Sequence, residues 1–316
     1  MGLIGTLARA SVRISDLDST GTARRVMTRA YAKNRARRAK TIAAEYGLQL
    51  LIPEHRTWAQ NSQGTMFILG SGSSVNDLTQ ADFRHIDLHT SIGFNAWPVH
   101  DFVPSVYAFE RFGRSPHKAR MVAHALHREE VFRRSPMVFV GDDYLRAPRQ
   151  QQLGPFLFSS FQVLVYGPLP IATSRVSHAF AAIDDMVRLR REGQLPLSLV
   201  PGIGASVERL TAIAAFGGHL DIVLVGVDLT DVNYFWDVDA TFLANRGIER
   251  LDSGQIGAVH RTNDPAQTRL PVTATMPALA KVLRERLGVK VWIGSPRSAL
   301  ADYLDVYPWR ERREDG

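Results

Sequence analysis

The chain has 316 residues, of which 45% are hydrophobic and 22% charged. These are the fractions of an ordinary globular protein, which excludes a wholly disordered chain, and no apolar run reaches the roughly 18 residues of a membrane-spanning helix. The absence of cysteine excludes disulfides, thiolate metal sites and a cysteine nucleophile. The net charge of +7 is of the kind that often accompanies a nucleic-acid or membrane partner.

The excess positive charge lies in the first 40 residues. They hold ten Lys and Arg against two Asp, a net charge of +8, so the other 276 residues carry a net charge of −1. Residues 22–47 are rich in Ala and Arg and contain no Pro, which predicts a helix that stops at Gly47. We expect residues 1–47 to form a basic helical arm that binds an anionic membrane surface, with a solvated helix as the alternative.

From residue 60 onward, apolar runs of strand length alternate with segments of helical period, which is typical of α/β folds. In chain order we expect strands at 65–70, 90–95 and 104–109, a helix at 116–133, strands at 136–141 and 162–167, helices at 174–191 and 205–216, a strand at 221–228, a helix at 275–287 and a strand at 289–294. The strands are apolar on both faces, which predicts a mainly parallel sheet covered by helices. One Rossmann-like α/β nucleotide-binding domain is therefore expected over residues 60–310.

A glycine-rich turn follows the strand expected at 65–70. Residues 70–74 read GSGSS, and the following residues begin an expected helix. Glycines at such a turn let the backbone approach a ligand, and helix N–H groups favour its phosphate. However, Val75 replaces the third glycine of the dinucleotide fingerprint, and the next strand ends in Asn95 rather than an acid, so NAD and FAD are not expected. A turn that needs glycine only for its geometry is the alternative.

Residues 229–272 show no periodicity and are rich in Asp, Asn, Gly and Thr. A loop of this length in a compact domain is usually a functional lid or a disordered segment. We expect residues 238–259 to form a lid that closes over the substrate and excludes water.

Six fragments in the same order resemble one known family. They are FILGSGSSVNDL (67–78), SIGFNAW (91–97), SVERLTAIAAFGGHLDIVLVGVDL (206–229), NYFWD (233–237), HRTND (260–264) and ALAKVLRERLGVKVWIGSPRSALADYL (278–304). Together they resemble the glycosyltransferase family 42 sialyltransferases, bacterial enzymes that use CMP-sialic acid to decorate lipooligosaccharide. The resemblance spans about residues 65–305 and implies a GT-A-like variant of the α/β fold.

The resemblance implies roles for individual residues. His260 falls on the motif that supplies the general base, and an imidazole suits that role near neutral pH. Tyr234 falls where a tyrosine contacts the phosphate, and its phenol can donate to the departing oxygen. The implied nucleotide-binding residues are Gly70, Ser71, Gly72, Ser74, Asn95 and Ser206.

The chain also departs from the family pattern. Ser71 stands where the family has an asparagine, and Thr230 where it has a second phosphate-binding tyrosine. An arginine expected shortly before Ser206 is absent, with Ile203 nearby, and Glu110 lies close to another asparagine position. The nucleotide and base positions are therefore retained better than the contacts to the sugar, and a CMP donor of Kdo, pseudaminic or legionaminic acid stays open.

The expected function is that of an inverting glycosyltransferase without metal or other cofactor. It would transfer a sialic-acid-like keto-sugar acid from CMP to a glycan acceptor, such as a lipid-linked glycan of a bacterial surface polysaccharide or lipooligosaccharide. The expected location is cytoplasmic, peripheral at the inner face of the membrane through residues 1–47, with no nucleic-acid partner.

Three rival interpretations remain. Asp237 and Asp239 form an Asp-x-Asp of the kind that holds Mn²⁺ or Mg²⁺ on a nucleotide-diphosphate sugar. The basic arm could instead bind nucleic acid, which predicts an affinity that depends strongly on salt. A catalytically inactive nucleotide-binding homologue is the third.

Overall fold

A computed structural model describes residues 21–51, 64–94, 96–109, 127–128, 130, 137–141, 161–171, 173–230, 233–239, 241–248, 260, 262–264, 266 and 268–314. Its strands are β1 (Gln49–Leu50), β2 (Thr65–Leu69), β3 (Thr90–Phe94), β4 (Val106–Phe109), β5 (Met137–Gly141), β6 (Gln162–Pro170), β7 (Leu199–Gly202), β8 (Asp221–Val225) and β9 (Lys290–Ile293). Its helices are α2 (Gly21–Glu45), α3 (Gln80–Asp87), α8 (Val176–Arg191), α9 (Ser206–Gly217), α10 (Val272–Leu287) and α11 (Trp309–Glu314). Four short 3₁₀ helices, η3 (Ser73–Asp77), η4 (Trp97–Val99), η5 (Phe235–Val238) and η6 (Ala244–Arg246), lie in the connections.

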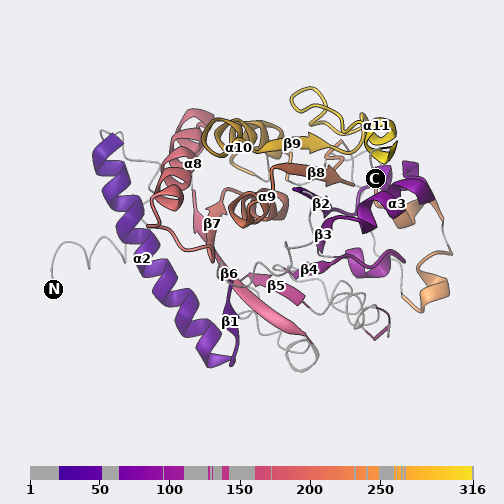
Figure 1. The fold of residues 1–316 in the computed structure, drawn as a ribbon, viewed down its shortest axis with the longest axis horizontal. Coiled ribbons are helices and arrows are strands. Elements are labelled where there is room, and N and C mark those ends of the chain that lie inside the picture. The colour runs from indigo at the N-terminus through magenta and orange to yellow at the C-terminus, as the bar shows by residue number, and fades with distance from the viewer. Residues whose placement is uncertain are drawn as a thin grey trace.

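The nine described strands form one sheet in the order β1-β6-β5-β4-β3-β2-β8-β9, with β7 paired to the end of β6 (Figure 1). Every described strand pair is parallel. The predicted α/β fold with a mainly parallel sheet is therefore confirmed.

The order of the strands reverses between β2 and β8. From β2 the chain adds strands outward through β3, β4, β5 and β6, and then returns to place β8 on the other side of β2. Leu69, the last residue of β2, lies opposite Gly93 on one side and Val225 on the other. In open parallel sheets, ligands bind beyond the carboxyl ends of the strands at such a switch point.

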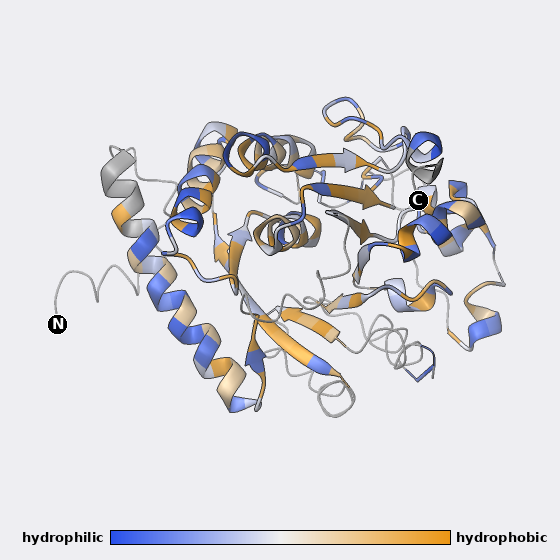
Figure 2. Ribbon diagram, in the orientation of Figure 1, coloured by the Kyte–Doolittle hydropathy of each residue, from blue (hydrophilic) through white to orange (hydrophobic). Residues whose placement is uncertain are grey.

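The central strands β2, β4 and β5 are buried at every position, which explains why they are mostly apolar, and they are largely orange in Figure 2. In β2, Met66 and Ile68 pack into a hydrophobic cluster that includes residues of α8, α9 and α10. Phe67 and Leu69 point to the other face, where they join a second cluster with Ile86 of α3. Alternating side chains of one strand thus serve two cores.

The helix predicted at 22–47 is present as α2, and it lies along the sheet beside β6, β1 and α8 (Figure 1). Its buried residues recur at helical spacing and are Thr28, Ala32, Arg35, Ala39, Ile42 and Ala43. Arg35 Nε donates to the carbonyl oxygen of Pro168 in β6 at 3.2 Å. From residue 28 to 43, one flank of this basic helix is therefore a packed part of the body.

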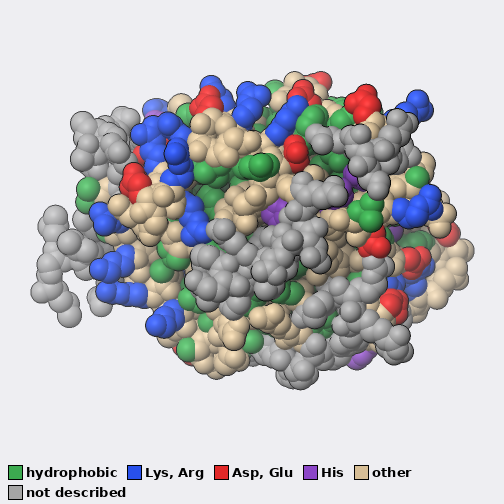
Figure 3. All heavy atoms as spheres, in the orientation of Figure 1, with side chains coloured by type: hydrophobic (Ala, Val, Ile, Leu, Met, Phe, Trp, Pro, Cys, Tyr) green, Lys and Arg blue, Asp and Glu red, His purple; other side chains and the backbone are tan. Residues whose placement is uncertain are grey.

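The opposite flank of α2 carries five exposed cations, which we call the basic flank: Arg29, Lys33, Arg37, Arg38 and Lys40. Lys and Arg side chains follow this edge of the molecule in Figure 3. Within the described residues, the structure shows no ion pair to any of the five. None of the described helices has both the length and the hydropathy to span a membrane.

Several elements differ from the sequence-based prediction. The helix expected after the glycine turn is the 3₁₀ helix η3, and a separate helix, α3, follows it behind a capping box in which Thr79 N–H donates to Asp82 at 2.8 Å. β1 and β7 were not predicted, because β1 has only two residues and half of β7 is Pro201 and Gly202, which are rare in strands. Three parts of the prediction lie outside the described residues: residues 1–20 of the expected arm, most of the helix expected at 116–133, and residues 240 and 249–259 of the expected lid.

Candidate active site at the switch point

Beyond the ends of β2 and β8, the two segments that follow these strands continue side by side. Gly70 N–H donates to Val225 O at 2.7 Å, and Gly72 N–H donates to Gly226 O at 2.8 Å. Gly226 has φ +63°, and a Cβ added to it would lie 2.4 Å from Gly70 O. The close approach of these two segments therefore requires glycine for steric reasons. This is in line with the alternative interpretation, in which the turn needs glycine for its geometry.

Asp228, which follows β8, is buried directly beneath the glycine turn. Its carboxylate accepts Ser74 N–H at 2.8 Å, is hydrogen-bonded by the Ser74 hydroxyl, and lies 3.4 Å from the Ser73 hydroxyl. A Cβ on Gly72 would lie 2.6 Å from an Asp228 oxygen. Asp228 thus accepts an N–H group at the start of η3, where the sequence predicted that the N–H groups would bind a phosphate.

The N-terminus of α9 is held by a buried acid. Glu208 is fully buried, and its Oε2 accepts the N–H groups of Gly204 at 3.0 Å and Ala205 at 2.9 Å. The hydroxyl of Thr275 in α10 is hydrogen-bonded to Oε1. Burial raises the pKa of Glu208, although these hydrogen bonds act in the opposite direction. The contacts fix the turn that brings Ser206 to the carboxyl end of the sheet.

The segment after β8 is pinned to the glycine turn. Tyr234 pairs with Gly72 in an antiparallel bridge, and Phe235 N–H donates to Ser71 O at 3.0 Å. Asn76 Nδ2 donates to Phe235 O at 2.9 Å. Residues about 160 positions apart in the chain are therefore neighbours here.

His260 is half-buried at the start of a short turn that leads to α10. Its Nδ1 lies 2.8 Å from the Thr262 hydroxyl oxygen and 3.4 Å from the Thr262 backbone nitrogen. The turn is anchored because Val272 N–H donates to Thr262 O at 3.1 Å and the Thr273 hydroxyl donates to Asn263 Oδ1 at 2.6 Å. The ring is thus held at Nδ1.

These segments enclose one pocket. Its lining residues are Ser71, Gly72, Phe94, Ala96, Ala205, Ser206, Val207, Gly226, Val227, Asp228, Leu229, Asn233, Tyr234, Trp236, His260 and Thr262. None of these lining residues is Lys or Arg. The pocket therefore offers neutral donors to an anionic ligand.

The structure brings together five of the eight residues predicted for the site, Ser71, Gly72, Ser206, Tyr234 and His260. Gly70 and Ser74 are not among the lining residues, and Ser74 is buried against Asp228. Asn95 lies outside the described residues. Sequence reasoning did not assign Asp228, Thr262 or Trp236 to the site, although the Gly-x-Asp at the end of the strand was a visible signal for the first.

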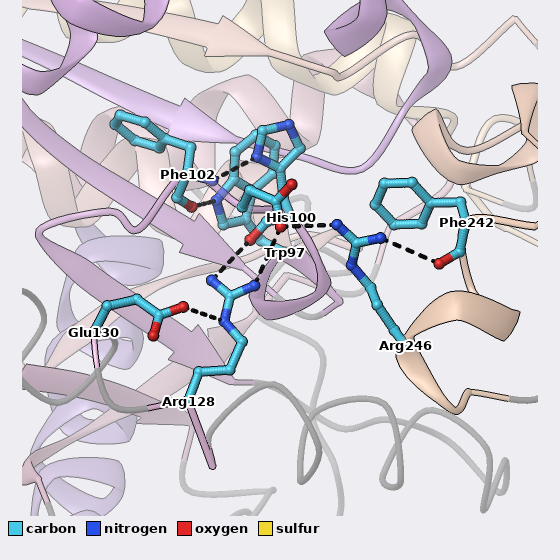
Figure 4. A network of polar contacts seen from close by, with 8 residues as sticks. Trp97, His100, Phe102, Arg128, Glu130, Phe242 and Arg246 are labelled. Carbon is cyan, nitrogen blue, oxygen red and sulfur yellow. Dashed lines mark hydrogen bonds and ion pairs between the residues drawn. The ribbon is translucent and has the colours of Figure 1, made fainter.

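A polar network supports the connection after β3 (Figure 4). His100 stacks on Trp97 with ring centroids 4.5 Å apart, and its Nδ1 accepts Phe102 N–H at 2.9 Å. Burial is the main reason why the pKa of His100 falls to about 4. Asp101 pairs with Arg246 at 2.8 Å, so η6, which belongs to the expected lid, is tied to this connection.

The carboxylates of the Asp-x-Asp serve two different turns. Asp237 Oδ2 accepts Tyr234 N–H at 2.8 Å. Asp239 is exposed, and its Oδ1 accepts the N–H and hydroxyl of Thr241, each at 2.8 Å; these bonds lower its pKa. Within the part of the chain that the structure describes, no three His, Asp or Glu side chains are grouped as a metal site.

No protein-family profile matches the chain, and no curated protein matches it. Among solved structures, the chain is similar to the sialyltransferase CstII from Campylobacter jejuni in complex with a substrate analogue, cytidine-5'-monophosphate, at 12% identity, 78% coverage of this chain, 86% of that chain and a TM-score of 0.41. It is also similar to the monofunctional alpha-2,3-sialyltransferase Cst-I from the same organism, at 13% identity, 78% and 81% coverage and a TM-score of 0.42. A third is the MAf glycosyltransferase from Magnetospirillum magneticum, at 18% identity and a TM-score of 0.41, where the likeness covers 83% of this chain and 35% of that one.

Proposed function

We propose that the chain is an inverting glycosyltransferase that moves a sialic-acid-like keto-sugar acid from a CMP donor to a glycan acceptor. One observation carries the proposal. Five residues from four separate sequence motifs, spread from Ser71 to His260, line a single pocket at the switch point of the sheet. This is where a parallel α/β sheet binds its ligand.

The N-terminus of α9 is proposed to meet the phosphate of CMP. The first N–H groups of a helix have no acceptor within the helix, and the helix dipole favours an anion there. Glu208 already accepts the N–H groups of Gly204 and Ala205, so the proposed donors are the N–H groups of Ser206 and Val207, which both line the pocket. The start of η3 is less suited, because Asp228 already accepts Ser74 N–H.

In the proposed reaction, an acceptor hydroxyl attacks the anomeric carbon while the bond from that carbon to the phosphate oxygen breaks. The bonding electrons leave with CMP, and the proton of the hydroxyl passes to His260 Nε2. Tyr234 donates its phenolic hydrogen bond to the departing oxygen. Base action at Nε2 requires the proton of the neutral ring to sit on Nδ1, and the Thr262 hydroxyl, 2.8 Å away, can accept from it. Attack from the face opposite CMP inverts the anomeric centre.

His260→Ala tests the base directly, with His178→Ala in α8, outside the pocket lining, as the matched control. We expect His260→Ala to lower kcat by a factor of about 10²–10⁴ with little change in CMP affinity. Full activity in this variant would show that His260 is not the base. The same assay with CMP donors of sialic, pseudaminic and legionaminic acid and Kdo identifies the sugar.

The reaction is proposed to need no metal, because the departing group is a monophosphate. Turnover should persist in EDTA. Loss of turnover in EDTA with recovery in Mn²⁺ would favour the metal-dependent alternative at Asp237 and Asp239.

The basic flank of α2 is proposed to hold the enzyme at the cytoplasmic face of an anionic membrane, close to lipid-linked acceptors. Because the other flank packs against the body, the attachment would be electrostatic rather than by insertion of an apolar face. The chain should sediment with anionic vesicles at low salt and be released at high salt, and replacing Arg29, Lys33 and Arg37 with Glu should abolish sedimentation. Tight binding to DNA or RNA without vesicle binding would contradict this location.

A further inference from the structure

Trp236 carries a buried hydrogen-bond donor with no acceptor among the described residues. The side chain is 2% exposed, and in the part of the chain that the structure describes its indole Nε1 has no hydrogen-bond partner. Native proteins satisfy nearly all buried N–H groups, because leaving one unpaired forfeits its hydration. This donor therefore calls for an explanation.

The other described tryptophans are satisfied by the protein. Trp97 Nε1 donates to Phe102 O at 3.1 Å, Trp292 Nε1 to Asp221 Oδ1 at 2.7 Å, and Trp309 Nε1 to Gly294 O at 2.8 Å. Among these four, only Trp236 lines the pocket. The tryptophan with the unsatisfied donor is thus the one that borders the candidate site.

The position of the Trp236 ring is fixed by its neighbours. Tyr234 stacks on it with ring centroids 4.6 Å apart and an interplanar angle of 15°, and Phe235 meets it nearly edge-on at 4.8 Å and 78°. The backbone of this segment is bound to the glycine turn through Ser71 and Gly72. The indole is therefore preorganised beside the tyrosine proposed for the departing phosphate.

We propose that the Trp236 indole N–H donates a hydrogen bond to a phosphate oxygen of the nucleotide bound in this pocket; this inference rests on the proposed function. An indole N–H can only donate, so its partner must be an acceptor. The described lining contains no Lys or Arg, so among these residues an anionic group would be bound by donors such as this indole N–H. Trp236 thereby becomes a phosphate-binding residue in addition to those that sequence reasoning assigned.

The test is ¹H–¹⁵N NMR of the indole groups in the full chain, with Trp236→Phe used to assign the Trp236 signal. Should that variant not fold, Phe variants of the other four tryptophans assign the signal by elimination. We expect CMP to move the Trp236 indole proton downfield and to slow its exchange with solvent. Cytidine, which lacks the phosphate, should leave that signal in place, and the indole signals of Trp292 and Trp309 serve as internal controls.

Binding measurements complete the test. Trp236→Phe should weaken CMP binding about tenfold or more, the loss expected for a hydrogen bond to a charged group, and leave cytidine binding unchanged. Trp292→Phe, at a residue that is not among those lining the pocket, should leave CMP binding unchanged. If CMP binds but neither shifts the Trp236 signal nor loses affinity in Trp236→Phe, this inference is wrong and the proposed function stands. If CMP does not bind the wild-type chain at all, both are wrong.

Discussion

Replacing His100 with asparagine should remove a defined part of the acid sensitivity of the fold. Burial lowers the pKa of His100 from 6.5 to about 4, so the folded protein holds it neutral in a range where the unfolded chain protonates it. A lowered pKa gives stability that is present above the unfolded pKa and is lost as the pH falls toward the folded pKa. The asparagine amide oxygen can take over the acceptor role of Nδ1 toward Phe102 N–H.

The size of the effect follows from the shift. At about 1.4 kcal/mol per pKa unit, a fall from 6.5 to about 4 corresponds to about 3 kcal/mol once the folded state has also titrated. Between pH 7 and pH 5, the wild-type chain should lose about 2 kcal/mol of unfolding free energy through this residue. Loss of the stacking on Trp97 affects the variant equally at both pH values and so cancels.

The assay is urea unfolding followed by tryptophan fluorescence at pH 7 and pH 5. His219, whose pKa burial also lowers to about 4, is present in both proteins, so the comparison isolates His100. The wild-type chain should lose about 2 kcal/mol more than His100→Asn over this interval. Equal losses in the two proteins would refute the assignment of a buried, neutral imidazole at this position.

Three further substitutions test the frame of the pocket. Burial raises the pKa of Glu208, so the stability that this residue contributes is fully present below about pH 4.5 and is lost as the pH rises through the folded pKa. In urea unfolding between pH 5 and pH 8, Glu208→Gln should therefore show a smaller loss of stability than the wild-type chain. An equal loss in both proteins would contradict the raised pKa. Gly226→Ala should destabilise the fold by about 3 kcal/mol or more, because its Cβ would lie 2.4 Å from Gly70 O. The control is Gly288→Ala, where φ is +71° but no atom lies within 4 Å of the added Cβ, and it should cost only about 1–2 kcal/mol. Equal losses of stability in the two variants would refute the steric argument. Asp228→Asn leaves one acceptor oxygen for three donors and should cost about 1–3 kcal/mol in thermal unfolding while weakening CMP binding; an unaffected stability would contradict its role as the cap of η3.

Local pattern was sufficient for the fold. Residues 66–69 and 222–225 are apolar at every position, as expected for strands of a sheet covered on both faces, and the structure places these two strands side by side in the core. The buried flank of α2 escaped detection because Thr28, Ala32 and Ala39 carry little hydrophobic signal, although their small side chains allow the helix to pack closely.

The site was only partly predictable, because its decisive contacts join residues far apart in the chain. The glycine turn was recognised, but its N–H groups meet Gly226 and Asp228, which lie more than 150 positions away. Nothing in the local sequence indicates that Asp228 would accept the N–H group of Ser74, which was predicted to bind a phosphate. The unsatisfied indole of Trp236 likewise becomes visible only when the partners of every tryptophan are known.

The most direct test of the account is the nucleotide preference of the pocket. Thermal unfolding of the wild-type chain should be measured with CMP, CDP, UDP and GDP at equal concentrations, since at equal concentration the ligand that binds the folded state more tightly raises the Tm more. CMP should stabilise the chain most, and the rise in Tm caused by CMP should be smaller in Trp236→Phe than in the wild-type chain. A larger rise in Tm with UDP or GDP than with CMP, or no rise with CMP, would contradict the proposed use of a CMP donor.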